Sequence, residues 1–126
     1  MSEKQAQDLQ RKKEEDLKRR RVRINVRTQM DNAIYAFMYA VESHDIEVEK
    51  KAEDYLIDLL FTPDTFDKCV KAIGGEEKRA KDLITSSRKI AEKTVKLALA
   101  EDKDTVSRPH VEQAIRSLQR ECWPFY

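Results

Sequence analysis

The residues with the clearest chemical potential are basic side chains clustered near the N-terminus. The segment from Lys18 to Arg23 reads KRRRVR and is the densest positive cluster in the 126-residue chain. Such a cluster suits ionic contact with nucleic-acid phosphates, although a solubilising tail is an alternative interpretation. The candidate phosphate contacts in this segment are Arg19, Arg20, Arg21 and Arg23.

A second set of basic residues follows helical spacing between residues 77 and 101. Apolar and small residues occupy one side of the expected helix, and five basic residues occupy the other: Lys81, Arg88, Lys89, Lys93 and Lys96. This face is either an ordinary solvated surface or a stripe that faces DNA. The candidate DNA contacts on it are Lys89, Lys93 and Lys96.

Other reactive residue types are scattered along the chain. Cys69 and Cys122 lack CxxC spacing and are expected to be free thiols, while His44 and His110 are isolated in the sequence. No glycine-rich phosphate loop and no recognisable Ser/His/Asp motif is present. We therefore expect a protein that is not an enzyme, without metal, cofactor or small-molecule substrate.

The composition favours a single helix-rich domain. Charged residues make up 39% of the chain, and it contains only two glycines and three prolines, too few turn residues for a sandwich or a barrel. No stretch approaches the roughly 20 apolar residues of a membrane span, and the charged N-terminus lacks a signal-peptide core. These features predict a cytoplasmic protein that does not enter a membrane.

The net charge of +1 is unevenly distributed. Residues 1–23 hold nine Lys/Arg and five Asp/Glu, which gives +4. Residues 24–126 hold the remaining sixteen basic and nineteen acidic residues, which gives −3. Any affinity for nucleic acid must therefore come from the N-terminal arm or from a local basic face.

The chain divides into three segments. Residues 1–23 form a charged arm that is either disordered or a solvated helix. Residues 24–61 form a helical segment: an extended entry at 24–26, a helix over 27–43, a break at 43–48 and a helix over 48–60. Tyr35 and Tyr39 are expected to widen the apolar stripe of the first of these helices.

The third segment, residues 62–126, shows clear helix boundaries. Thr62 is a predicted N-cap before Pro63, Gly74-Gly75 end that short helix, and the longest helix covers 77–101. Thr105-Val106 is a brief strand-like step before a final helix capped by Ser107. The C-terminal residues CWPFY, 122–126, are expected to pack on the body or on a partner chain.

The order of short helix, loop, long helix, short strand-like loop and short helix over residues 62–119 resembles the histone fold. The likeness is strongest over 89–115, which is similar to the second half of archaeal and bacterial histones. The matching positions are Ile90-Ala91, Val95-Lys96-Leu97-Ala98, Thr105-Val106, Val111 and Ala114. The resemblance implies that the 105–106 step pairs with the first loop of a partner unit and presents Lys103, Thr105 and Arg108 to DNA phosphates.

Three positions depart from the histone pattern. Lys103 stands where the family has Arg, and Asp104 stands where it has Lys. His110 stands where it has Asp, so the Arg–Asp clamp of the family is absent. These departures weaken the inference of DNA binding more than the inference of the fold.

The segment 24–61 echoes the second half of a histone fold, with a helix, an extended break and a helix. The chain would then be an intrachain pseudo-dimer, which resembles bacterial proteins with tandem histone-like units. The alternative is a homo-oligomer of single folds in which 24–61 is an added helical element.

The leading functional hypothesis is therefore an all-α, histone-like, nucleoid-associated protein in the cytoplasm. It would bind double-stranded DNA without sequence preference and with strong salt dependence. The alternative is a histone-fold module that mediates protein–protein interaction and does not touch DNA.

Overall fold

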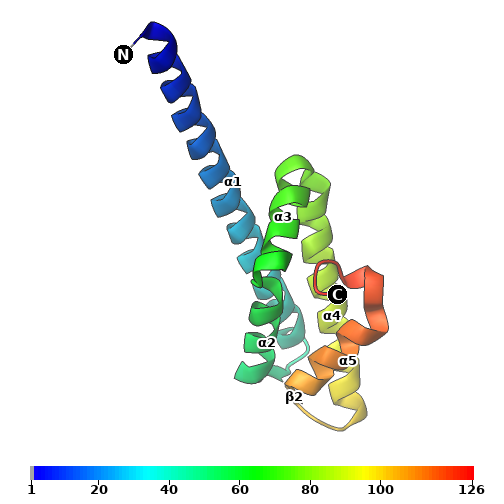
Figure 1. The fold of residues 1–126 in the computed structure, drawn as a ribbon. Coiled ribbons are helices and arrows are strands. Elements are labelled where there is room, and N and C mark those ends of the chain that lie inside the picture. The colour runs from blue at the N-terminus through cyan, green and yellow to red at the C-terminus, as the bar shows by residue number, and fades with distance from the viewer. Residues whose placement is uncertain (1) are drawn as a thin grey trace.

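Five α-helices, two short strands and one 3₁₀ turn make up residues 2–126, the part of the chain that the computed structural model describes (Figure 1). The elements are α1 (Glu3–Glu42), β1 (Glu47–Val48), α2 (Lys50–Leu60), α3 (Pro63–Gly75), α4 (Glu77–Ala100), β2 (Thr105–Val106), α5 (Arg108–Leu118) and η1 (Gln119–Cys122). The expectation of an all-α protein is confirmed.

Helix α1 is one continuous helix of 40 residues, and it includes the arm. It begins at a capping box, because Ser2 Oγ accepts the Gln5 backbone N–H and Gln5 Oε1 accepts the Ser2 N–H. Residues 2–21 are exposed along their whole length, and the arm extends away from the rest of the protein (Figure 1). Of the two alternatives for the arm, disorder and a solvated helix, the structure shows the helix.

The predicted extended entry at residues 24–26 is wrong. These residues are helical, and Val26 is buried one turn before Met30. Val22 packs against the core as well, close to Gly74 at the end of α3. Packing of this face against α3 outweighs the preference of an Ile-Asn-Val step for extended structure.

The two strands lie side by side in parallel, and Glu47 pairs with Thr105 while Val48 pairs with Val106. The Glu47 N–H donates to the Asp104 carbonyl at 3.0 Å, and the Glu49 N–H donates to the Val106 carbonyl at 2.9 Å. β1 follows α1, and β2 follows α4. These two long helices run in the same direction, as Figure 1 shows.

The partner of β2 differs from the one that the histone resemblance implied. That resemblance pairs Thr105-Val106 with a first loop, whereas β1 follows the long helix α1 and corresponds to a second loop. The connection between α3 and α4 is the single residue Glu76, which leaves no loop strand there.

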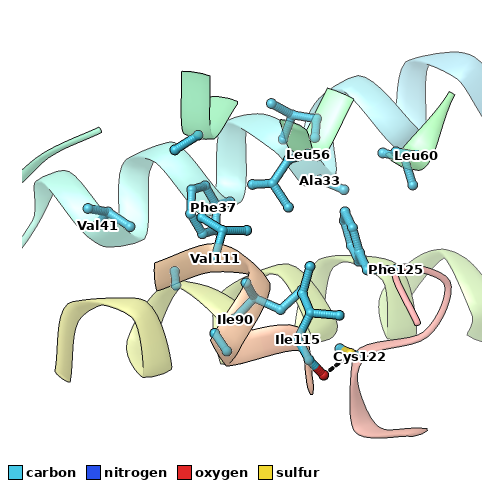
Figure 2. Packing of buried hydrophobic residues seen from close by; sticks show 14 of the residues in the cluster. Ala33, Phe37, Val41, Leu56, Leu60, Ile90, Val111, Ile115, Cys122 and Phe125 are labelled. Carbon is cyan, nitrogen blue, oxygen red and sulfur yellow. Dashed lines mark hydrogen bonds between the residues drawn. The ribbon is translucent and has the colours of Figure 1, made fainter. Parts of the chain in front are cut away.

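The core lies between α1 and α4 and is closed by α2 and α5. Figure 2 shows Phe37 from α1, Leu56 from α2, Ile90 from α4 and Val111 from α5 pointing toward one another. All four side chains are almost fully buried. Residues 24–61 and 62–126 therefore share one core, since α1 packs on α3 and α4 while α2 packs on α5.

The C-terminal tail closes the far side of this core. Phe125 is buried near Ile115, and Cys122 Sγ lies 3.7 Å from the Ile115 carbonyl oxygen (Figure 2). Trp123 is half-buried and lies under the guanidinium of Arg79, 5.2 Å from the ring centroid. Tyr126 remains exposed, so packing of the tail on the body is confirmed for its inner residues only.

Most of the predicted boundaries in the third segment are confirmed. Thr62 Oγ1 accepts the Thr65 backbone N–H, and α3 ends at Gly75. The expectation for Tyr35 and Tyr39 is wrong, because their exposed fractions are 72% and 78%. Both tyrosines lie across α1 from the buried Phe37.

Candidate nucleic-acid interface

The basic residues of the arm are exposed and almost free of partners. Within residues 2–126, no ion pair involves any residue from Lys18 to Arg21. Arg23 alone is engaged: its Nη1 lies 3.7 Å from Asp67 Oδ1, and its guanidinium stacks 4.8 Å from the Phe66 ring centroid. Both members of the ion pair are more than half exposed, so this contact holds Arg23 only weakly.

The helical state of the arm distributes these charges around its axis. Successive residues on an α-helix are rotated by roughly 100°. Four consecutive basic residues, Lys18 to Arg21, therefore surround most of the helix instead of forming one stripe.

The predicted stripe on α4 exists. Lys89 and Lys96 are exposed and Lys93 is half-buried, and all three line a shallow hollow between α4 and Leu118 of α5. Lys89 Nζ lies 3.8 Å from Glu121 Oε1. Lys93 and Lys96 make no ion pair in the part of the chain that is described.

The third predicted group, next to β2, is engaged with acidic residues. Lys103 Nζ lies 3.3 Å from Glu101 Oε2, and the Thr105 hydroxyl donates to Asp104 Oδ1 at 3.1 Å. Arg108 Nε donates to Glu112 Oε1 at 2.6 Å, and its guanidinium stacks over Tyr55 at 4.8 Å. A phosphate would have to compete with these acidic side chains for the donors of Lys103, Thr105 and Arg108. The histone resemblance did not imply this competition.

The structure does not bring all the predicted contacts onto one surface. The arm and the β1–β2 pair lie at opposite ends of the long helices, and the α4 stripe lies between them (Figure 1). The arm carries the strongest local positive charge of the three groups.

Arg27 is a basic residue that the sequence reasoning missed. Its guanidinium lies 5.9 Å from the Phe61 ring centroid, and together with Arg23, Ile24 and Phe66 it lines a hollow at the base of the arm. The sequence signal was the i, i+4 spacing of Arg23 and Arg27, which the predicted extended entry between them concealed.

Three other titratable groups with altered pKa values, Glu101, Cys69 and Cys122, lie outside the arm and the α4 stripe. The hydrogen bond from His110, followed by that from Lys103, lowers the pKa of the Glu101 carboxyl. Burial raises the pKa of each thiol, Cys69 and Cys122, to about 11. No group of three or more His, Cys, Asp or Glu side chains that could hold a metal ion occurs among residues 2–126.

No protein-family profile matches the sequence, and the comparisons with curated proteins and with solved structures found no match.

None of the helices in the described residues combines the length and the apolar character that crossing a membrane requires.

Proposed function

We propose that this protein is a sequence-tolerant, architectural DNA-binding protein whose main contact is the N-terminal half of α1. The observation that carries the proposal is the placement of Lys18 to Arg21 on a fully exposed helix, without acidic partners in the described chain. A body of net charge −3 cannot supply such affinity by its overall field, so the local charge of the arm is decisive.

The dimensions of the arm fit a DNA groove. An α-helix is about 10–12 Å wide with its side chains, and the major groove of B-DNA is about 12 Å wide. The exposed arm is roughly 30 Å long, close to one turn of the duplex. Basic residues on several sides of such a helix would meet phosphates on both walls of the groove.

The α4 stripe is the secondary contact in this proposal. Lys93 and Lys96 are free to bind phosphate, and Lys89 is held only by a long surface pair. Lys103, Thr105 and Arg108 contribute least, because each already has an acidic partner.

The histone-like assignment and the location at a nucleoid belong to the same proposal. The helix–strand–helix unit formed by α4, β2 and α5 supports the local resemblance. The arrangement departs from that resemblance at the strands. β2 pairs with β1, which follows the long helix α1, and not with a strand from a first loop.

The alternative is a protein-interaction module that does not bind DNA. It is favoured by two aromatic side chains, Tyr35 and Tyr39, which are exposed on neighbouring turns of α1. Large exposed aromatic residues are enriched at protein interfaces.

Fluorescence anisotropy of a labelled random duplex of about 30 base pairs, titrated across a salt series, tests the proposal. The test variant replaces Arg19, Arg20, Arg21 and Arg23 by Ala. Loss of four phosphate contacts would reduce the slope of log K against log salt by about 3 to 4.

The matched control removes four exposed lysines from α2 and α3: Lys50, Lys51, Lys68 and Lys71, each replaced by Ala. The control has the same net charge as the test variant, and we expect its salt slope to match that of the natural sequence. An equal loss in both variants would contradict a specific role for the arm. Absence of binding by the full chain at low salt would overturn DNA binding and favour the interaction module.

A further inference from the structure

We propose that the exposed arm of α1 also docks a second copy of this chain, with the two helices antiparallel and centred on Leu17. This inference concerns assembly of the protein without DNA, and it does not depend on the proposed function.

The first observation is a second apolar stripe on α1. Six residues lie within roughly a third of the helix circumference at about 100° per residue: Ala6, Leu9, Leu17, Ile24, Tyr35 and Tyr39. The stripe lies on the side of α1 away from the buried residues Val26, Met30 and Phe37. The core therefore accounts for one apolar face of α1 and leaves the other open.

The members of this stripe in and beside the arm are well exposed. The exposed fractions are 45% for Leu9, 53% for Leu17 and 68% for Ile24. Leu17 and Ile24 are seven residues apart, the spacing at which side chains return to one seam of paired helices. The stripe is interrupted by polar residues, because at roughly 100° per residue the same third of the circumference also holds Gln10, Lys13, Arg20, Arg21, Arg27, Thr28 and Asp31. The long side chains of Lys13 and Arg20 can carry their charges out to water.

The second observation is the order of charges around Leu17. The sequence EED at 14–16 precedes Leu17, and KRRR at 18–21 follows it. An antiparallel pair that meets at Leu17 places the acidic block of each copy against the basic block of the other. A parallel pair would place like charges together, so the charge order selects the antiparallel arrangement.

Helical geometry identifies the side chains that would meet. Asp16 and Arg20 lie toward one edge of the stripe, with Arg20 just inside it, while Glu14 and Arg21 lie toward the other edge. Across an antiparallel pair, Asp16 approaches Arg20 of the second copy and Glu14 approaches Arg21 of the second copy. Each contact occurs twice by symmetry.

These charges are not locked in ion pairs within the single chain, although Glu14, Glu15 and Asp16 each precede a basic residue by four positions on the same helix. No ion pair within residues 2–126 involves residues 14–16 or 18–21. Residues 2–21 of the arm are all exposed, and the arm meets α3 at its base, where Val22 and Arg23 line a hollow with Val70. A second copy supplies the missing contacts along the arm, and Arg19, on the opposite side from the stripe, stays free.

Sedimentation equilibrium of the full chain without DNA tests the assembly, with an expected mass that rises with concentration from 14.8 kDa toward twice that value. One variant combines Glu14→Lys with Asp16→Lys, and a second combines Arg20→Glu with Arg21→Glu. Each alone is expected to stay monomeric because like charges then face one another. A 1:1 mixture of the two variants is expected to restore the doubled mass.

The matched control reverses two exposed lysines of α2, Lys50→Glu with Lys51→Glu, and is expected to assemble like the natural sequence. Far-UV circular dichroism confirms that each variant keeps its helices. A natural chain that remains monomeric at all concentrations, or charge variants that assemble normally, would overturn the proposal.

Cysteine cross-linking tests the orientation. Ala6→Cys and Thr28→Cys, introduced in separate chains, are expected to cross-link to each other and not to themselves, because the antiparallel register brings residue 6 near residue 28. The natural Cys69 and Cys122 are buried. Efficient cross-linking of Ala6→Cys to itself would show a parallel pair and would contradict the model of antiparallel docking.

Discussion

The buried imidazole of His110 lies with its Nε2 2.8 Å from a carboxylate oxygen of Glu101. The Ser107 backbone N–H donates to the other ring nitrogen, Nδ1, at 3.1 Å, so Nε2 carries the proton that is donated to Glu101. This contact joins the end of α4 to the start of α5 across the β2 loop. It also explains why a histidine is accommodated where the histone resemblance implied an aspartate.

Replacement of His110 by Ala is expected to reduce the free energy of unfolding by about 2 kcal/mol, because it removes a buried, hydrogen-bonded side chain. Urea unfolding followed by circular dichroism measures the change. A loss close to zero would show that the contact contributes little to holding α5 against α4.

Replacement of Glu101 by Gln is expected to produce a pH-dependent loss of stability. The pKa of Glu101 is lowered in the folded state, so its carboxylate stabilises the fold above the ordinary Glu pKa of about 4.3. This stabilisation disappears as the pH falls through the lowered pKa. Urea unfolding of both proteins at several pH values should show a gap at neutral pH that closes in acid, and a constant gap would contradict the assignment.

Replacement of Phe37 by Ala is expected to cost about 3–5 kcal/mol of unfolding free energy, since the ring is buried at the centre of the core. Tyr35→Ala is the matched control on the same helix, and its effect should stay within about 0.5 kcal/mol because Tyr35 is exposed. Denaturant unfolding of the two variants makes the comparison. Similar losses of unfolding free energy in both variants would contradict the finding that Phe37 faces the core while Tyr35 faces solvent.

Replacement of Gly75 by Ala is expected to stabilise the protein by about 0.4–1 kcal/mol. Gly75 is helical, and an added Cβ would meet nothing within 4 Å. At the neighbouring Gly74, an added Cβ would lie 3.0 Å from Val22 Cγ1, so Gly74→Ala should gain less or lose stability. Thermal melts of the two variants test this order, and a reversed order would be inconsistent with the packing of α1 on α3.

The two thiols are expected to be unreactive in the folded protein. Burial raises the pKa of Cys69 and Cys122 to about 11, so at pH 8 little thiolate is present, and the sulfur atoms are covered. Titration with a chromogenic disulfide reagent should detect both thiols only after denaturant is added. Rapid reaction of either thiol without denaturant would contradict this expectation.

Local features of the chain were predictable because they depend on neighbours in sequence. The N-cap at Thr62 and the helix end at Gly75 arise from short-range backbone chemistry. The extended character of Thr105-Val106 was also predictable locally, although its partner strand was not. The all-α class followed from periodic apolar residues and scarce turn residues.

Features that depend on long-range packing were not predictable in the same way. Residues 24–26 continue a helix because Val22 and Val26 pack toward α3 and the core. Glu76 alone connects α3 to α4, so no strand forms there, and β2 pairs with β1 instead. Tyr35 and Tyr39 are a different case, because helical spacing of roughly 100° per residue already places both across α1 from Phe37. The expectation that they widen the buried stripe did not follow from that spacing.

The sequence by itself determined most of the helical segments after residue 26, where most of them end, and that the strongest positive charge is concentrated near residues 18–23. These are consequences of side-chain identity and spacing along a helix. Only the tertiary structure decided that the arm extends α1 into solvent, and that the β2-side basic residues are occupied by acidic neighbours. The reason is physical: exposure and ion pairing depend on which surfaces remain after the core has formed, and that is a property of the whole fold.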